Sequence, residues 1–442
     1  MVHKDLMNPH YTEWLDFLAA GENWSRGRIE EHQLAKLREM ASYLEANTQG
    51  YRELWAAHGL SAADIRSLAD LDKFPCVAKE DIRDNLNRYT VQIPGMNYMT
   101  TGGSTGLPFG FYWTPQAFAR ELASKAHQYR RIGWKEGDRQ LVLRGIHLDS
   151  PDRTLFFPEF NELRCSSYHL TPEWMESYRL KALDFRPEWL RCYPSSGFIF
   201  SRFIRETGRE FPQLKGLLCA SENLYDYQKR HMAETFGCRV FSHYGHYELS
   251  VIAGFCEKND MYHVLPQYGY AQLLDKNDKP VTAPGEIGEI VATSFIMTAT
   301  GFFRYRTRDF AVYQGECCPD CGRPYQLWSG IEGRLQDFFV TRDGRYISIA
   351  AINMHDDIFD ELAQFQFYQE TPGIVHLRYI PKQNFDAGAE RKIRERLLTK
   401  FDDSMELVFE MTSEEGINRT ARGKSLYLVQ KIAMDSAYVC SK

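Results

Sequence analysis

The sequence predicts an α/β protein with a large layered N-terminal domain and a small α+β domain after it. Three patterns predict this: helical spacing over 1–95, strand-like runs alternating with helices through the middle, and a mixed pattern at the end. At 442 residues, the chain is long enough for two or three domains on a prior of about 150 residues each. We expect the division at 1–335 and 336–442.

The helical lead-in rests on residue spacing and on one cap. Apolar residues recur every three or four positions over 30–60, as in an amphipathic helix. Ser61 then suits the N-cap of the next helical segment.

The middle of the chain alternates between two kinds of segment. Short apolar runs at 139–146 and 214–223 are separated by helical stretches at 114–133 and 223–237. Such alternation favours a mainly parallel sheet covered by helices. From 262 to 314 the pattern becomes strands.

The end of the chain mixes both elements. We expect a hairpin around Asp343-Gly344, a helix at 351–362, strands at 365–370 and 374–381, and a helix at 389–403. No long linker precedes this part, so a short hinge should join the domains.

Composition excludes several classes of protein. The chain carries 53 basic and 59 acidic residues, a net charge of −6, and no basic run that indicates a nucleic-acid partner. No segment approaches the roughly 20 apolar residues of a membrane span, and the N-terminus lacks a secretory signal pattern. Most of the 10 Cys stand singly in apolar surroundings, which indicates a reducing compartment, the cytoplasm. We expect a homodimer only because homodimers are common among soluble enzymes.

A glycine-rich loop is the sharpest local feature. Residues 100–106 read Thr-Thr-Gly-Gly-Ser-Thr-Gly, with hydroxyl groups and exposed backbone N–H groups that suit a polyphosphate. An ordinary surface turn explains the same composition. No Lys-Ser/Thr pair follows, so it is not a P-loop; Arg422-Gly-Lys-Ser425 lacks the earlier glycine of one.

Further motifs follow in a fixed order along the chain. They are 74–82 (FPCVAKEDI), 244–248 (YGHYE), 305–309 (YRTRD), 333–337 (GRLQD) and 420–424 (TARGK). Over about 70–430 the chain resembles the adenylate-forming superfamily, and within it the phenylacetate–CoA ligase-like branch with its capsular-polysaccharide-locus relatives. The resemblance implies that ATP activates a carboxylic acid as its acyl-AMP.

The resemblance also implies residue roles. Lys424 would neutralise charge at the reacting groups, Arg334 would reach the phosphates, and Glu248 would ligate Mg²⁺. The nucleotide would be held by Thr100, Thr101, Gly102, Gly103, Ser104, Thr105 and Gly106 at its phosphates, by Ser221, Glu222, Tyr244 and Gly245 beside the adenine, and by Asp309 at the ribose. Taken singly, each charged residue could be an ordinary surface group.

Two positions depart from the superfamily pattern. Gly103 stands where a hydroxyl residue is common, and Arg308 stands where the pattern has glycine. Arg308 could reach a phosphate or form a local ion pair. Gln336 or Asp337 would carry the rotation of a mobile C-terminal domain after adenylation; an ordinary turn is the alternative.

A Cys-x₂-Cys knuckle ending in glycine predicts a metal site. Cys318 and Cys321, with Cys256 and His263, would form a closed Cys₃His set suited to structural Zn²⁺. Cys317 could replace Cys318, and unliganded thiols in a turn are the alternative.

The acid and the acceptor are less defined. Candidate acid-binding residues are Tyr193, His147, Ser242 and His243, and the many aromatic residues suit an aryl or arylacetic acid, although core packing explains them equally. Coenzyme A is the favoured acceptor, with an amine such as an amino acid or amino sugar as the alternative. A non-catalytic interaction protein on a ligase fold is a third interpretation.

Overall fold

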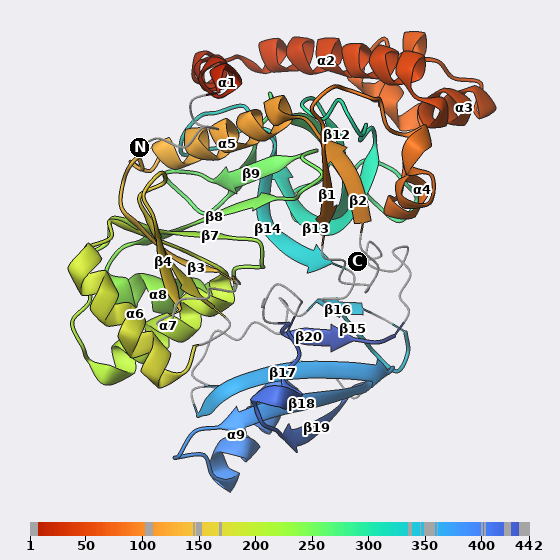
Figure 1. Ribbon diagram of the computed structural model, residues 1–442. Helices are drawn as coiled ribbons and strands as arrows, with labels where there is room; N and C mark the ends of the chain where they lie inside the picture. Colours follow the sequence, from red (N-terminus) through yellow and green to blue (C-terminus); the bar gives the residue numbers. More distant parts are fainter. Residues whose placement is uncertain are drawn as a thin grey trace.

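The structure is a computed structural model, and it describes residues 8–101, 109–144, 146, 153–167, 170–334, 338–344, 346–348, 359, 361–398, 401, 404–419 and 426–432. Figure 1 shows a large body that carries the N-terminal helices along one side, with a smaller unit of strands at the opposite end. No helix within the described ranges is long and apolar enough to cross a membrane.

The helical lead-in is confirmed. Asn8 caps the first helix by accepting a hydrogen bond from the backbone N–H of His10 at 3.0 Å, and Ser25 caps the second in the same way. Trp14 packs toward the body and donates to the hydroxyl of Ser124 at 2.9 Å. The elements are α1 (Pro9–Ala20), α2 (Arg26–Asn47), α3 (Gln49–Ala57), η1 (Ala62–Asp64), η2 (Leu68–Lys73), α4 (Lys79–Asp84) and η3 (Leu86–Arg88).

One 12-stranded sheet runs through the large body, in the order β11-β12-β13-β14-β10-β9-β8-β7-β6-β3-β5-β4. The bounds are β3 (Gln140–Arg144), β4 (Thr154–Phe157), β5 (Glu162–Ser166), β6 (Trp189–Cys192), β7 (Gly216–Ala220), β8 (Arg239–Gly245), β9 (Ile252–Phe255), β10 (Tyr262–Val264), β11 (Gly269–Leu274), β12 (Ile287–Ser294), β13 (Tyr305–Gly315) and β14 (Leu327–Arg334).

The expectation of a mainly parallel sheet holds for only part of it. Strands β5, β3, β6, β7 and β8 are mutually parallel, because helices connect most of them. The remaining neighbours are antiparallel, including β11, β12 and β13, which form the predicted strand region.

Helices cover both faces of the parallel strands. Leu141, Leu190 and Leu217 face a core shared with α6 (Pro172–Phe185), α7 (Pro194–Thr207) and α8 (Asp226–Phe236). Leu218 and Phe241 face the other way, toward Tyr129 at the end of α5 (Pro115–Arg130). Successive residues of a strand point to opposite faces, so this apolar alternation places α5 across the sheet from α6, α7 and α8.

Two smaller β-structures complete the chain. The hairpin of β1 (Asn97–Thr101) and β2 (Phe109–Trp113) flanks residues 102–108. The smaller unit has a hairpin of β15 (Phe338–Val340) and β16 (Tyr346–Ser348), as predicted around Gly344, whose φ is 82°. Its main sheet, β19-β18-β17-β20, has β17 (Leu362–Thr371), β18 (Ile374–Pro381), β19 (Glu406–Met411) and β20 (Leu428–Gln430), with α9 (Ala387–Leu398) and η7 (Glu414–Gly416). Most of the helix predicted at 351–362 lies outside the described residues, and Leu362 begins β17.

Candidate functional site

Two sequence motifs meet through a reciprocal pair of hydrogen bonds. Tyr244, near the end of β8, donates its hydroxyl to Oδ2 of Asp309 on β13 at 2.7 Å. In the opposite direction, Tyr305 on β13 donates to Oε1 of Glu248 at 3.2 Å. Asp309 is 7% exposed and Glu248 9%. The tyrosine of each motif therefore holds the carboxylate of the other at one buried edge of the sheet.

The second oxygen of Glu248 belongs to a further chain of polar groups. Nδ1 of His246 lies 2.9 Å from Oε2 of Glu248, and the hydroxyl of Ser250 lies 3.1 Å from Nε2 of the same ring. The imidazole thus joins the carboxylate to a buried hydroxyl. The sequence analysis did not single out His246, although it lies inside the motif at 244–248.

The unusual arginine beside Asp309 makes a local ion pair. Arg308 has a φ of 63°, in the left-handed region that favours glycine, which is what the superfamily pattern places there. Its guanidinium Nη2 lies 2.5 Å from Oε2 of Glu80 on α4. Of the two alternatives for Arg308, the structure gives the ion pair.

The ends of the glycine-rich loop are anchored beside the carboxylates. Residues 102–108 lie outside the described ranges, but the backbones of Thr100 and Thr101 pair with Gly110 and Phe109 in the β1–β2 hairpin. The ring of Phe109 stacks on Tyr305, with centroids 6.5 Å apart and planes at 11°. The hairpin therefore delivers both ends of the loop to the side chain that binds Glu248.

Two of the expected adenine-side residues, Ser221 and Glu222, directly follow β7. Ser221 has a φ of 73°, a conformation in which few non-glycine residues are found. Oε2 of Glu222 accepts a hydrogen bond from the backbone N–H of Ser195 at 3.0 Å, in the first turn of α7. A carboxylate at a helix N-terminus is favoured by the helix dipole, so Glu222 ties β7 to α7.

The described acid-binding candidates occupy different environments. His243 is half-buried, and its Nδ1 lies 2.9 Å from the hydroxyl of Tyr129. Ser242 is buried, with its hydroxyl 3.0 Å from that of Tyr262, as in a core side chain. Tyr193 is buried and precedes the first turn of α7. His147 lies outside the described residues.

The remaining predicted catalytic and hinge residues are described in part or not at all. The backbone of Arg334 pairs with Asp309 in the β13–β14 register. Lys424, Gln336 and Asp337 lie outside the described residues, as do Gly102, Gly103, Ser104, Thr105 and Gly106. Gly245 ends β8, opposite Ile252.

The smaller unit contacts the large body close to Lys424 in the sequence. Tyr427 follows Lys424 by three residues. The amide of Gln228 on α8 donates to its hydroxyl at 2.7 Å, and the ring of Tyr225 meets it edge-on at 5.6 Å. These contacts link β20 of the smaller unit to the start of α8.

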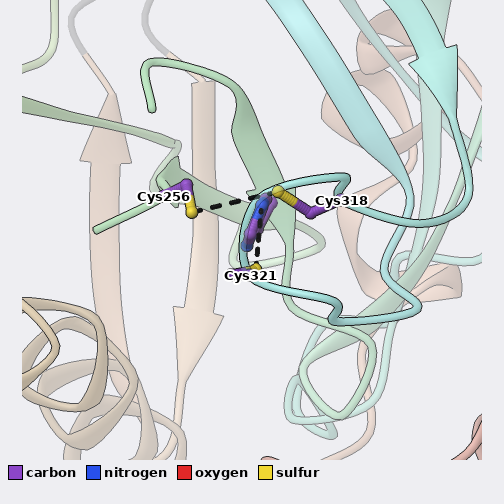
Figure 2. Close-up of side chains that lie close together, drawn as sticks. Cys256, Cys318 and Cys321 are labelled. Atoms are coloured by element: carbon purple, nitrogen blue, oxygen red, sulfur yellow. Dashed lines mark hydrogen bonds between the residues drawn. The ribbon is translucent and has the colours of Figure 1, made fainter. Parts of the chain in front are cut away.

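Four potential metal ligands are gathered at the other end of the antiparallel strands. The ligand atoms of Cys256, His263, Cys318 and Cys321 all lie within 4.8 Å of one another. The sulfur atoms of Cys256 and Cys318 are 4.0 Å apart, and the sulfur of Cys321 is 3.9 Å from Nε2 of His263. Figure 2 shows the three sulfur atoms gathered around one point.

The structure distinguishes Cys318 from Cys317. Cys318 is 1% exposed and faces the cluster, whereas Cys317 is exposed and its sulfur lies 3.8 Å from the carbonyl of Gly322. Burial alone would raise the pKa of Cys318, but hydrogen bonds from the Cys321 backbone and the Asn259 amide outweigh it and lower that pKa. A lowered pKa favours the thiolate, the form that binds metals.

A charged network ties the cysteine knuckle to the N-terminal helices. Arg323 binds both oxygens of Glu257 at 2.8 Å and also contacts Glu22. Glu22 in turn lies 2.6 Å from Nε2 of His127 and accepts from Arg131 at 3.0 Å. Burial alone would raise the pKa of Glu22, but the His127 hydrogen bond and the Arg131 charge hold it well below its usual value.

Curated relatives resemble the chain over most of its length, whereas no family model matches it. A phenylacetate–coenzyme A ligase of Pseudomonas putida is 26% identical over 344 residues, which cover 76% of this chain and 77% of that protein. Protein CapK of Staphylococcus aureus is 22% identical over 425 residues, covering 91% of this chain and 89% of that protein.

Solved structures share the fold. A 2-hydroxyisobutyryl-CoA ligase in its postadenylation state, bound to an acyl-AMP, matches with a TM-score of 0.73 and 19% identity over 92% of this chain and 91% of that chain. The same enzyme in its thioesterification state matches with a TM-score of 0.62 and 19% identity, over 93% of this chain and 91% of that chain. The GH3.15 acyl acid amido synthetase matches with a TM-score of 0.63 and 13% identity, over 97% of this chain and 95% of that chain.

Proposed function

We propose that this protein, a relative of the phenylacetate–CoA ligases among the adenylate-forming enzymes, uses ATP to convert a carboxylic acid to its acyl-AMP and transfers the acyl group to coenzyme A. The reciprocal pairing of Tyr244 with Asp309 and of Tyr305 with Glu248 carries this proposal. It brings the two carboxylates that the motifs assign to the nucleotide to one buried edge, beside both ends of the glycine-rich loop.

The carboxylates suit the two roles that adenylation requires. A carboxylate accepts hydrogen bonds strongly, so Asp309, held by Tyr244, is suited to the ribose hydroxyls. Each oxygen of Glu248 has more than one lone pair, so the carboxylate can bind a hard cation while it accepts from Tyr305 and His246. Mg²⁺ at Glu248 would supply positive charge that screens the phosphates.

The loop at 100–106, Arg334 and Lys424 would act on the phosphates. Backbone N–H groups in a glycine-rich loop can approach phosphate oxygens closely. The backbone of Arg334 lies opposite Asp309, which supports a role beside the nucleotide. Lys424 would stabilise the charge that develops when the acid attacks the α-phosphate.

The smaller unit would be the mobile domain, joined near Gln336 and Asp337. The higher TM-score with the postadenylation structure, 0.73 against 0.62 for the thioesterification state, supports an arrangement suited to the first half-reaction. Rotation of this unit would then remove Lys424 and admit the thiol of coenzyme A. We take residues 336–442 as this domain.

An amine acceptor is the second candidate. The amido synthetase matches 97% of this chain, more than the 92% covered by the CoA ligase. Both acceptors consume the same acyl-AMP, so the nucleotide site does not separate them.

The Cys₃His cluster would hold a structural Zn²⁺. With Zn–S bonds of about 2.3 Å, a tetrahedral site places its sulfur atoms about 3.8 Å apart, close to the observed 4.0 Å. Zn²⁺ there would brace β9, β10 and the loop before β14. None of the nine described cysteines forms a disulfide, which supports a reducing compartment, and we place the protein in the cytoplasm.

An acceptor panel tests the proposal. AMP formation from ATP would be followed with a range of acids and with coenzyme A, amino acids, amino sugars or no acceptor, for the wild type and Lys424→Ala. The proposal predicts AMP and an acyl-CoA, with both lost in the variant. Formation of an amide instead would favour the second candidate, and the absence of AMP with every acid would count against adenylation.

A further inference from the structure

A cluster of basic side chains lies at the carboxyl ends of the parallel strands, on the face of the sheet that α5 covers. It is formed by Arg144 at the end of β3, Arg191 on β6, Lys125 and Tyr129 on α5, and His243 on β8. The hydroxyl of Tyr129 and Nδ1 of His243 are 2.9 Å apart, so helix and sheet meet at this point. The proposed nucleotide chemistry does not use the cationic side chains of Arg144, Arg191 and Lys125.

The strand register places these residues together. Arg191 lies opposite Val142 on one side and Leu218 on the other, in the row that continues to Phe241. Two residues further along the strands come Arg144 and His243, on the same face. This row is at the carboxyl ends of the parallel strands, where α/β sheets bind their ligands.

Among the described residues, the charges in and around the cluster do not balance. Arg191 binds Oε1 of Glu162 at 2.6 Å, and Arg164 binds the other oxygen of the same carboxylate at 2.7 Å. Lys125 binds Glu121 at 2.6 Å. Arg144 has no ion pair among the described residues. Four cationic side chains therefore share two carboxylates.

The cluster is partly open to solvent. The side chain of Arg191 is 26% exposed, although its Nε is buried without a hydrogen-bond partner among the described residues. Arg144 is exposed and His243 half-buried. Burial lowers the pKa of His243 to about 3, with the charges of Lys125, Arg191 and Arg144 adding to the effect. The ring is thus neutral, and the arginines and lysine supply the positive charge.

We propose that the acid activated by this enzyme carries a second anionic group, a carboxylate or phosphate, which binds Arg144 and Arg191 in the basic cluster. This inference rests on the proposed adenylation and names its substrate class. His243 directly precedes Tyr244, which binds Asp309. Both residues lie near the carboxyl end of β8, and the arginines lie at the same end of the parallel strands. A substrate whose reacting carboxylate lies beside Asp309 and Glu248 would extend its other end along this end of the sheet toward the arginines.

The experiment compares acids that differ only in the charge of the far end. Glutarate would be matched with its monoamide, and 4-carboxyphenylacetate with 4-carbamoylphenylacetate and phenylacetate. Acid-dependent ATP–pyrophosphate exchange gives kcat/KM for each. The dianionic acids should exceed their amides by about 10- to 100-fold, the effect of a charge-assisted hydrogen bond. Calorimetric titration of the same acids, with a non-hydrolysable ATP analogue present, repeats the comparison without turnover.

Three variants separate binding from stability. Arg144→Gln alters an exposed side chain, and Arg191→Gln alters a more buried one. Each substitution should reduce the ratio of kcat/KM for the dianionic acid to kcat/KM for its amide at least about tenfold. Arg164→Gln is the matched control, since Arg164 shares Glu162 with Arg191 but belongs to β5, farther from His243.

The outcomes distinguish this inference from the proposed function. A preference for dianionic acids that both test variants lose and the control keeps would support it. Equal or faster exchange with the amides or phenylacetate would overturn it and leave adenylation intact. Equal losses for both acids in Arg144→Gln would overturn it too, because the arginine would then bind the reacting carboxylate. No exchange with any acid would refute both.

Discussion

The two neighbouring cysteines of the knuckle offer a matched test of the metal site. Cys318→Ser removes a buried member of the Cys₃His cluster, and Cys317→Ser changes an exposed thiol beside it. Both replace sulfur with oxygen at adjacent positions. Only the first should alter metal binding, because the sulfur of Cys318 lies 4.0 Å from that of Cys256, close to the tetrahedral spacing.

The expected loss of stability follows from linkage. A metal present at about 100 times its dissociation constant stabilises the folded state by about 2.7 kcal/mol. Cys318→Ser should forfeit at least that amount, since three ligands bind zinc far more weakly than four. Cys317→Ser should change the free energy of unfolding by less than about 0.5 kcal/mol, as expected for a surface substitution.

The assays are zinc content by elemental analysis and the urea midpoint of unfolding. Wild type and Cys317→Ser should each carry about one zinc per chain, with Cys318→Ser depleted and less stable. If both variants retained zinc and stability equally, or if the wild type contained none, the assignment of the cluster as a zinc site would be wrong.

Three further predictions concern the nucleotide site, the contact between the units and pH. Tyr305→Phe should lower kcat/KM for ATP about tenfold in pyrophosphate exchange, because Glu248 loses a hydrogen bond worth about 1.5 kcal/mol; unchanged kinetics would contradict the role of the pair. Tyr427→Phe, which breaks the bond from Gln228, should slow exchange about 2- to 10-fold but leave the reaction of supplied acyl-AMP with coenzyme A unaffected, whereas equal losses in both would indicate general damage. Because the folded-state pKa of Glu22 is lowered from 4.5, its stabilisation is present above that pH and is lost as the pH falls. Glu22→Gln should cost about 3 kcal/mol at neutral pH, measured by urea unfolding, and should weaken acid sensitivity; unchanged acid sensitivity would contradict this.

The motifs assign Glu248 and Asp309 to one nucleotide site, and those roles stay predictions. Glu248 and Asp309 lie in separate motifs, and their common location was predicted only because the motifs occur together. The cross-pairing with Tyr305 and Tyr244 could not be predicted, since it depends on how β8 and β13 approach in space.

The sequence was less informative where long-range contacts decide the environment. Cys317 and Cys318 are neighbours of identical chemistry, and only the turn of the backbone decides which one faces the cluster. The basic cluster was missed for a similar reason. Its cations are scattered over β3, α5 and β6, and only the parallel register brings Arg144 and Arg191 to one face.

The fold shows the same division between local pattern and long-range pairing. Apolar spacing predicted the helices of the lead-in and the strands from 262 to 314. The direction of pairing was harder to predict, because an apolar run such as 214–223 fits a parallel or an antiparallel neighbour. Of the helix predicted at 351–362, the structure describes only residues 359, 361 and 362, and Leu362 begins β17, which pairs with β18.

Acid-dependent ATP–pyrophosphate exchange tests the central claim most directly, because it reports formation of the acyl-AMP before any acceptor takes part. The account predicts exchange that requires an acid and Mg²⁺, falls sharply in Asp309→Ala, and yields AMP when an acceptor is added. ATP cleavage to ADP and phosphate, or an absence of exchange with every acid tested, would contradict it.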